Sequence, residues 1–226
     1  MKKIIISILA ILLATVSMSA QGFVDFRLEG GASFNFGSIM LNKEKLNTKN
    51  MTGYHLGAFA DFKVAGGFFV GSGLKFSMKG NATEGTAGLG ASKTIFHYIE
   101  LPINVGYKLN LSRSVALALQ TGPYFSFAMA GTRQNGTSLA NLGKSYSIFK
   151  EGLARIGDDF KAKRFDIGWG LATRLYYSHY YATFGMDFGF LNVLNNTSKD
   201  TTIGSIKDNL LSLNNKQCYI GLGICF

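Results

Sequence analysis

Apolar residues alternate with other residue types along eight stretches of the chain. From Ile99 to Leu109 every second residue is apolar, and the positions between them include Glu100 and Lys108. Because successive side chains of a β-strand point to opposite faces, this period of two predicts strands with one apolar face. The predicted strands cover residues 24–36, 54–64, 68–79, 95–109, 115–127, 165–175, 181–190 and 217–226.

The charged side chains of the predicted strands all lie on the face opposite the apolar one. No Asp, Glu, Lys or Arg falls on an apolar-face position. This separation fits a barrel or a sandwich, and it does not by itself decide which face meets solvent. The charged residues of the polar face are Asp25, Arg27, Glu29, Asp61, Lys63, Lys75, Lys79, Glu100, Lys108, Asp166, Arg174 and Asp187.

The connections between the predicted strands alternate in length. Residues 65–67, 110–114 and 177–179 form tight turns, whereas 37–51, 80–93, 131–163 and 192–216 are long. Short turns at one end, long loops at the other and an even number of strands are typical of outer-membrane barrels. The sequence therefore predicts an all-β fold, an eight-stranded antiparallel transmembrane up-and-down β-barrel with its apolar face outward and a filled polar lumen.

Aromatic side chains of the apolar face gather near the ends of the predicted strands. Such girdles mark the membrane–water interfaces of barrels. The alternative is a soluble lipocalin-like barrel with the apolar face turned inward, but it explains neither the alternating loop lengths nor the terminal Phe226. The girdle residues are Phe62, Phe68, Tyr107 and Phe226 at the end with the tight turns, and Phe34, Tyr54, Phe76, Phe127 and Phe165 at the other.

The N-terminal segment has the layout of a secretory signal peptide. Lys2 and Lys3 precede an apolar run over residues 4–16, and small residues follow. As a helix this run would rise only about 20 Å, short of the roughly 30 Å of a bilayer core, which argues against a retained anchor. We expect residues 1–20 to be cleaved, after Ser19 or Ala20, and residues 21–226 to form the barrel.

Composition and single residues add detail. The chain is 47% hydrophobic with 28 Gly, which suits an apolar outer wall over small inward-facing residues. Cys218 and Cys225 lie on one predicted strand roughly 23 Å apart, beyond the reach of a disulfide, so both are expected to be free thiols. Pro102 and Pro123 lack the N–H donor that a closed barrel needs, which predicts local bulges.

Four short motifs are similar to segments of a known family. They are Glu100–Leu101–Pro102 with Tyr107–Lys108, then Gly122–Pro123–Tyr124, Arg164–Phe165–Asp166–Ile167–Gly168, and Gly189–Phe190–Leu191–Asn192. Their order and spacing resemble the PorT-type small outer-membrane β-barrels of Bacteroidetes over nearly all of residues 21–226. The resemblance implies the same barrel. The activities of that family are largely unassigned, and a few members resemble components of the type IX secretion apparatus.

An eight-stranded barrel is just wide enough for side chains to fill its interior. Acids and bases on the inner face therefore predict a paired lumen charge network, because an unpaired buried charge is costly. A filled lumen argues against a porin. Phe226 resembles the C-terminal signal read by the barrel-insertion machinery. The predicted network members are Arg27, Glu29, Asp61, Lys63, Lys75, Glu100, Lys108, Asp166, Arg174 and Asp187.

The third and fourth long loops contain apolar residues at helical spacing, which predicts an amphipathic helix in each. Such helices either cap the barrel mouth or dock on a partner or a lipid surface. The net charge of +10 favours contact with outer-membrane lipid and lipopolysaccharide rather than nucleic acid. The helix candidates are Tyr146, Phe149, Leu153, Ile156 and Phe160, and then Ile203, Ile206, Leu210 and Leu213.

Two classes of function follow from the sequence. The first is a structural or interaction barrel that binds an unidentified protein partner through its outer loops or periplasmic turns, as an accessory of a secretion or envelope system. The second is a lipid-modifying enzyme that uses His55 with Ser33 and Glu29. No motif supports the enzyme. The sequence contains no metal-ligand cluster, phosphate loop or nucleic-acid module, so no cofactor is expected.

Overall fold

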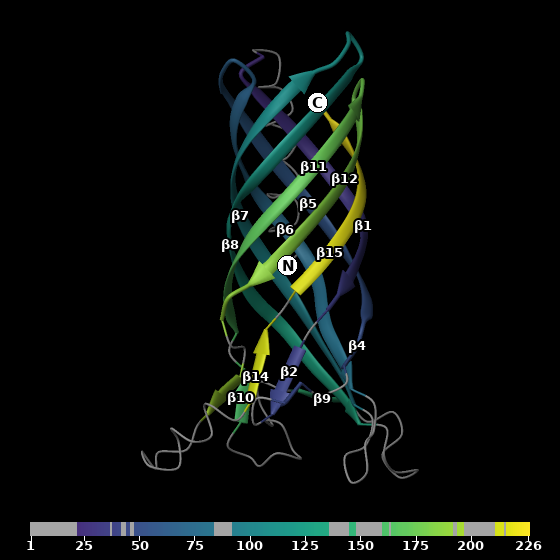
Figure 1. The fold of residues 1–226 in the computed structure, drawn as a ribbon, viewed down its shortest axis with the longest axis vertical. Helices are drawn as coiled ribbons and strands as arrows, with labels where there is room; N and C mark the ends of the chain where they lie inside the picture. Colours follow the sequence, from purple (N-terminus) through teal and green to yellow (C-terminus); the bar gives the residue numbers. More distant parts are fainter. Residues whose placement is uncertain are drawn as a thin grey trace, which may run out of the picture.

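A computed structural model shows a closed antiparallel barrel of eight long strands (Figure 1). It describes residues 22–36, 38–41, 44–45, 48–83, 92–135, 145–147, 160–162, 164–191, 194–196, 211–214 and 216–226. The predicted signal peptide lies outside these residues and stays a prediction. The long strands are β1 (Val24–Asn35), β5 (Met51–Ala65), β6 (Phe68–Thr83), β7 (Ser92–Asn110), β8 (Val115–Asn135), β11 (Phe165–Tyr177), β12 (Tyr180–Gly189) and β15 (Lys216–Cys225).

Each long strand pairs with the long strand before it and the one after it in the chain, and β15 pairs with β1 to close the barrel. The predicted up-and-down topology is therefore confirmed. We call the end with the tight turns the turn end and the end with the long connections the loop end. In Figure 1 the turn end is at the top.

Within the described residues, seven short strands lie in the long connections and at the loop end of the molecule (Figure 1). β4 extends the sheet beside β6, and β9 extends it beside β8. β14, β2 and β3 form a three-stranded sheet, and β10 pairs with β13. The short strands are β2 (Ser38–Leu41), β3 (Glu44–Lys45), β4 (Thr48–Lys49), β9 (Ser145–Ser147), β10 (Phe160–Ala162), β13 (Leu194–Asn196) and β14 (Leu211–Asn214).

The predicted loop helices are wrong where the structure describes them. Tyr146 lies in β9, Phe160 in β10 and Leu213 in β14. β8 continues past the loop end of the barrel, and its unpaired N–H and C=O groups recruit β9 as a further strand. Backbone pairing of this kind overrides side-chain periodicity. The other candidates, Phe149, Leu153, Ile156, Ile203, Ile206 and Leu210, lie outside the described residues.

The tight turns have local causes. Gly66 and Gly67 join β5 to β6 with φ of 58° and 91°, a region that glycine enters without a steric penalty. Ser178 joins β11 to β12 with φ of 57°. Between β7 and β8, the Ser112 hydroxyl oxygen accepts hydrogen bonds from the backbone N–H groups of Ser114 and Val115. Such side-chain caps replace the ladder bonds that a reversing chain cannot make.

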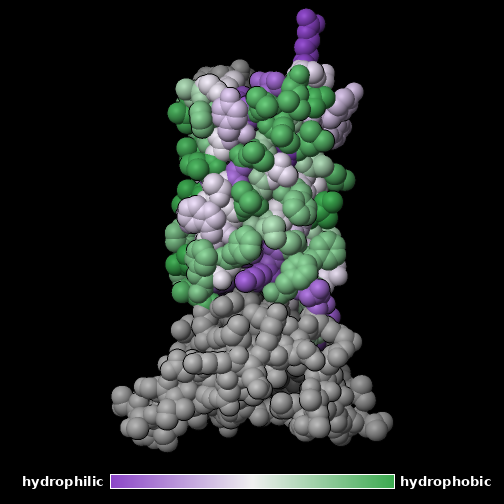
Figure 2. Space-filling model, viewed as in Figure 1, coloured by the Kyte–Doolittle hydropathy of each residue, from purple (hydrophilic) through white to green (hydrophobic). Residues whose placement is uncertain are grey.

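Exposed apolar side chains cover the outer wall of the described strands, and Figure 2 shows one face of this wall. Leu56, Leu171 and Leu222 are 60%, 52% and 73% exposed, whereas the charged residues at the middle of the barrel face inward and are buried. This arrangement excludes the lipocalin-like alternative. Eight of the nine predicted girdle residues are exposed, and Phe76 is half-buried. The exposed ones are Phe34, Tyr54, Phe62, Phe68, Tyr107, Phe127, Phe165 and Phe226. Among the described residues, no helix is long and apolar enough to cross a bilayer.

The two prolines do not create the predicted bulges. Pairing of β6 with β7 has the same register on both sides of Pro102, and pairing of β8 with β11 continues through Pro123. Near Pro102 the ladder loses bonds without a shift, and the Ser72 hydroxyl donates to the Pro102 carbonyl at 2.9 Å. The register shifts lie elsewhere, at Lys63/Ala65 and at His97/Tyr98. Cys218 and Cys225 are free, as expected.

Gly31 of β1 is closely packed between β5 and β15. A Cβ added there would collide with the Ile220 carbonyl oxygen and with the His55 ring. We predict that Gly31→Ala lowers the free energy of unfolding by about 1–3 kcal/mol, as overpacking does. At Gly170 the nearest atom to an added Cβ is a side-chain oxygen of Asp187 at 3.1 Å rather than a backbone atom, so Gly170→Ala serves as the control. Urea unfolding of the refolded protein measures both, and equal losses would refute this account of Gly31.

Candidate functional site

The inner face of the barrel brings acidic and basic side chains together in its buried interior. Alternation along each strand directs them inward, where glycine and alanine of neighbouring strands leave space. Of the predicted network, Lys63 and Lys108 lie at the turn end with higher exposure. The buried members are Arg27, Glu29, Asp61, Lys75, Glu100, Asp166, Arg174 and Asp187, and Lys79 joins them.

Two arginines share one aspartate in what we call the arginine cluster (Arg27, Arg174, Asp61 and Glu29). Arg27 donates from Nε and Nη2 to the two Asp61 carboxylate oxygens at 2.8 and 2.9 Å. Arg174 donates from Nη1 to the same carboxylate at 2.9 Å. Glu29 accepts from Thr183 at 2.8 Å and lies 3.2 Å from His55 Nε2. Two positive and two negative side chains thus balance within one buried group.

Two lysines share two carboxylates in the lysine cluster (Lys75, Lys79, Glu100 and Asp187). Lys75 Nζ lies 2.8 Å from Glu100 and 2.6 Å from Asp187, and Lys79 Nζ lies 2.5 Å from Glu100. Glu100, which is 0% exposed, also accepts a hydrogen bond from Ser77 at 2.8 Å. Gln217 donates to Asp187 at 3.2 Å. Charge is again balanced, as burial requires.

The third group, the mouth cluster, has two cations and one carboxylate. Asp25 lies 2.7 Å from Lys63 Nζ and 3.3 Å from Lys108 Nζ. The Lys63 and Lys108 side chains are 46% and 29% exposed, so water screens much of their attraction to Asp25. This cluster therefore carries a surplus positive charge that water and ligands can reach.

Little space is left between the arginine and lysine clusters. A cavity of about 30 Å³ lies there, with Gln120 and Tyr124 in its lining. Gln120 Oε1 and the Tyr124 hydroxyl have no hydrogen-bond partner among the described residues. A polar cavity of this size holds only one or two water molecules. The middle of the lumen is therefore filled rather than open.

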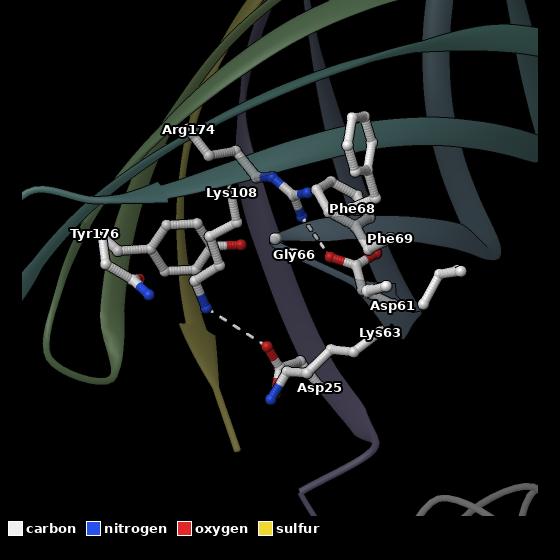
Figure 3. A pocket seen from close by; sticks show the side chains of 13 residues that line it. Asp25, Asp61, Lys63, Gly66, Phe68, Phe69, Lys108, Arg174 and Tyr176 are labelled. Carbon is white, nitrogen blue, oxygen red and sulfur yellow. Dashed lines mark hydrogen bonds and ion pairs between the residues drawn. The ribbon is translucent and has the colours of Figure 1, made fainter.

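The turn end of the lumen is hollow instead. A cavity of about 450 Å³ is lined by Asp25, Lys63 and Lys108 of the mouth cluster and by Asp61 and Arg174 of the arginine cluster (Figure 3). The β5–β6 turn from Val64 to Phe68 completes its rim, together with Phe69, Asn110 and Tyr176. The described residues thus form a barrel that is closed at its middle and hollow at the turn end.

Residues 19–199 match the family described as outer membrane protein beta-barrel domain. The chain belongs to this family. Its members are outer-membrane barrels, so the protein resides in the outer membrane, and by the rule for such barrels its turn end faces the periplasm. The apolar wall described above is therefore the lipid-facing surface.

The chain is similar, at low identity, to several solved outer-membrane proteins. A major outer membrane protein of Thermus thermophilus is 15% identical with a TM-score of 0.48, over 90% of this chain and 99% of that one. OprG of Pseudomonas aeruginosa is 13% identical with a TM-score of 0.47, over 89% and 95%. Ail of Yersinia pestis, crystallised with the heparin analogue sucrose octasulfate, is 12% identical with a TM-score of 0.43, over 90% and 99%. A search of curated proteins gave no match.

The aromatic lining of this outer-membrane barrel was not assigned a role by the sequence. Lys79 Nζ lies 4.5 Å from the ring centre of Tyr124, and Lys75 Nζ lies 4.7 Å from that of Tyr219. Rings of this kind stabilise a buried cation through their negative faces. The signal was available, because Tyr124 and Tyr219 alternate onto the same face as the charges. The network predicted from the sequence also omitted Lys79, which that alternation places inward.

The residues of the hypothetical hydrolase site do not form a triad. His55 Nε2 faces Glu29, while the Ser33 hydroxyl donates to the Met78 carbonyl at 3.5 Å. Ser33 and His55 are 0% and 1% exposed, which leaves no approach for a lipid. Among the described residues, no group of three or more His, Cys, Asp or Glu is placed to hold a metal ion.

Proposed function

We propose that this protein is an integral outer-membrane anchor that binds a protein partner. The partner binds either to the parts of β6, β7 and β8 that extend beyond the membrane at the loop end or to the periplasmic turns. The filled lumen supports this role, because it leaves no continuous path for a solute between the arginine and lysine clusters. The function of such a barrel therefore depends on the loops and turns that it exposes on either side of the membrane.

The observation that carries the proposal is the unequal length of the strands. β6, β7 and β8 contain 16, 19 and 21 residues, whereas β12 and β15 contain 10 each. About 9–11 residues suffice for a tilted strand to cross the membrane. We call the excess at the loop end the outer extension; β4 and β9 pair with its edges. A sheet carried this far beyond the bilayer offers a surface for a partner.

The resemblance to PorT-type barrels supports a partner within an envelope or secretion assembly. Three residues of the resembling motifs, Glu100, Tyr124 and Asp166, face the lumen on adjacent strands. The net charge of +10 further supports contact of the outer surface with anionic lipopolysaccharide.

Site-specific photo-crosslinking in cells tests the proposal. A photoreactive residue is placed at Lys93 in the outer extension, at His179 in a periplasmic turn, and at Leu171 on the lipid-facing wall as the control. All three positions are exposed. We expect a discrete protein adduct from Lys93 or His179 and none from Leu171. Adducts with lipid alone at all three positions would refute a partner-binding role.

The filled lumen also predicts that the protein does not conduct ions. In planar bilayers the purified protein is expected to give no steady ion conductance, because ion passage would require breaking the buried pairs of both clusters. A porin that is purified and reconstituted by the same procedure serves as the positive control. Steady single-channel steps from the wild-type protein would contradict a closed lumen.

A further inference from the structure

The cavity at the periplasmic end has the size of a small-molecule site. Its volume of about 450 Å³ lies within the roughly 300–1,000 Å³ typical of ligand pockets. It opens beside the β5–β6 turn, and Figure 3 shows charged side chains from several strands pointing toward one another across it. The filled middle of the lumen does not account for an open volume of this size at the turn end.

The charge of the cavity favours an anion. Lys63 and Lys108 share the single carboxylate of Asp25. At the floor, Arg174 shares Asp61 with Arg27. The residues that line the cavity therefore include three cations and two carboxylates (Lys63, Lys108 and Arg174 against Asp25 and Asp61).

Arg174 supplies a second, independent observation. It is 1% exposed, yet its Nε and Nη2 have no hydrogen-bond partner among the described residues. In Arg27 the same two atoms form the fork that binds the Asp61 carboxylate. This edge of a guanidinium matches a carboxylate with two parallel bonds. Arg174 is itself part of the cavity lining, where its guanidinium centre lies 5.1 Å from the centre of the Phe69 ring and 5.7 Å from that of the Tyr176 ring.

The walls of the cavity are apolar and aromatic. The buried rings of Phe69 and Tyr176 line it beside the cations, and Val64 and Phe68 lie at its rim. Such walls favour a ligand with an apolar body, since burying that body removes its surface from water. We propose that the periplasmic cavity binds a small carboxylate with an apolar or aromatic body, such as the C-terminal end of a peptide or a free aromatic acid. This site is separate from the outer extension, and its rim is formed by one of the periplasmic turns.

Calorimetric titration of the refolded protein in a neutral maltoside detergent tests the proposal. The probes are N-acetylphenylalanine, its uncharged amide, and 3-phenylpropanoate. The variants are Lys63→Gln/Lys108→Gln, the same pair with Asp25→Asn, and Lys93→Gln as the control at the opposite end of the barrel. Arg174→Lys, which retains the charge but lacks the fork, is included if its boiling-dependent gel shift shows that it folds.

We expect saturable binding of the carboxylates and none of the amide. Both mouth variants should weaken binding about tenfold, as loss of charge-assisted hydrogen bonds does, while Lys93→Gln has no effect. Agreement between the double and triple variants would exclude repulsion by an unpaired Asp25 as the cause. Tighter binding of N-acetylphenylalanine than of 3-phenylpropanoate would assign a peptide terminus, and the reverse a free acid. Equal binding of acid and amide, no binding, or an equal loss in Lys93→Gln would overturn the proposal.

Discussion

Replacing Glu100 by alanine is expected to lower the free energy of unfolding by about 3–5 kcal/mol, the usual cost of breaking a buried ion pair. Glu100 is 0% exposed and is the carboxylate that pairs with Lys79 within the described part of the chain. Without it, two lysines would have Asp187 alone to neutralise them. A buried ammonium that has lost its partner accounts for most of the expected loss.

Equilibrium unfolding in urea, followed by gel mobility, measures this effect. Asp25→Asn is the matched control, because the mouth cluster is partly exposed and pairs of that kind contribute about 0–1 kcal/mol. Glu100→Leu combined with Lys79→Met should be less damaging than Glu100→Ala alone, since Lys75 and Asp187 remain as a balanced pair. A loss below about 1 kcal/mol for Glu100→Ala would show that the cluster is not a buried, mutually dependent unit.

Placing an arginine at Leu171 is expected to cost about 2–4 kcal/mol of stability in a bilayer. Leu171 is 52% exposed on the outer wall, midway along β11. There the side chain faces the hydrocarbon core, where a charged group loses its hydration. For a water-facing wall the same substitution would change stability by no more than about 0.5 kcal/mol.

The position along the strand provides the control. Tyr177→Arg lies at the periplasmic end of β11 and is 69% exposed, so the arginine can reach the interface at a cost of about 0–1 kcal/mol. Unfolding of the two variants from lipid vesicles compares their free energies directly. Similar small losses at both positions would mean that the apolar wall does not lie in a membrane.

The barrel was predictable from the sequence because its two faces have opposite chemistry. Alternation from Ile99 to Leu109 sets the inward and outward sides of β7, and the tight turns set the topology. A shift of one residue would move Glu100 into lipid, so register is strongly constrained. The same alternation is sufficient to assign Arg27, Asp61 and Arg174 to the inner face.

The partners within the lumen were not predictable. Arg174 and Asp61 are 113 positions apart and meet across the barrel, which depends on how far each strand is staggered against the next. The predicted helix at Tyr146 was wrong for another reason. Helical spacing reports only the pattern of side chains, whereas the edge of β8 offers backbone hydrogen-bond partners that β9 pairs with. The role of Phe226 in insertion and the cleavage of residues 1–20 stay predictions.

The most direct test of the central claim is the gel mobility of the protein from isolated outer membranes, with and without boiling. A filled, closed barrel in the outer membrane predicts that the unboiled protein migrates as a compact species and that boiling shifts it to the mobility of the unfolded chain. A protein found in the soluble periplasmic fraction, with the same mobility before and after boiling, would contradict the membrane barrel and with it the lipid-facing wall.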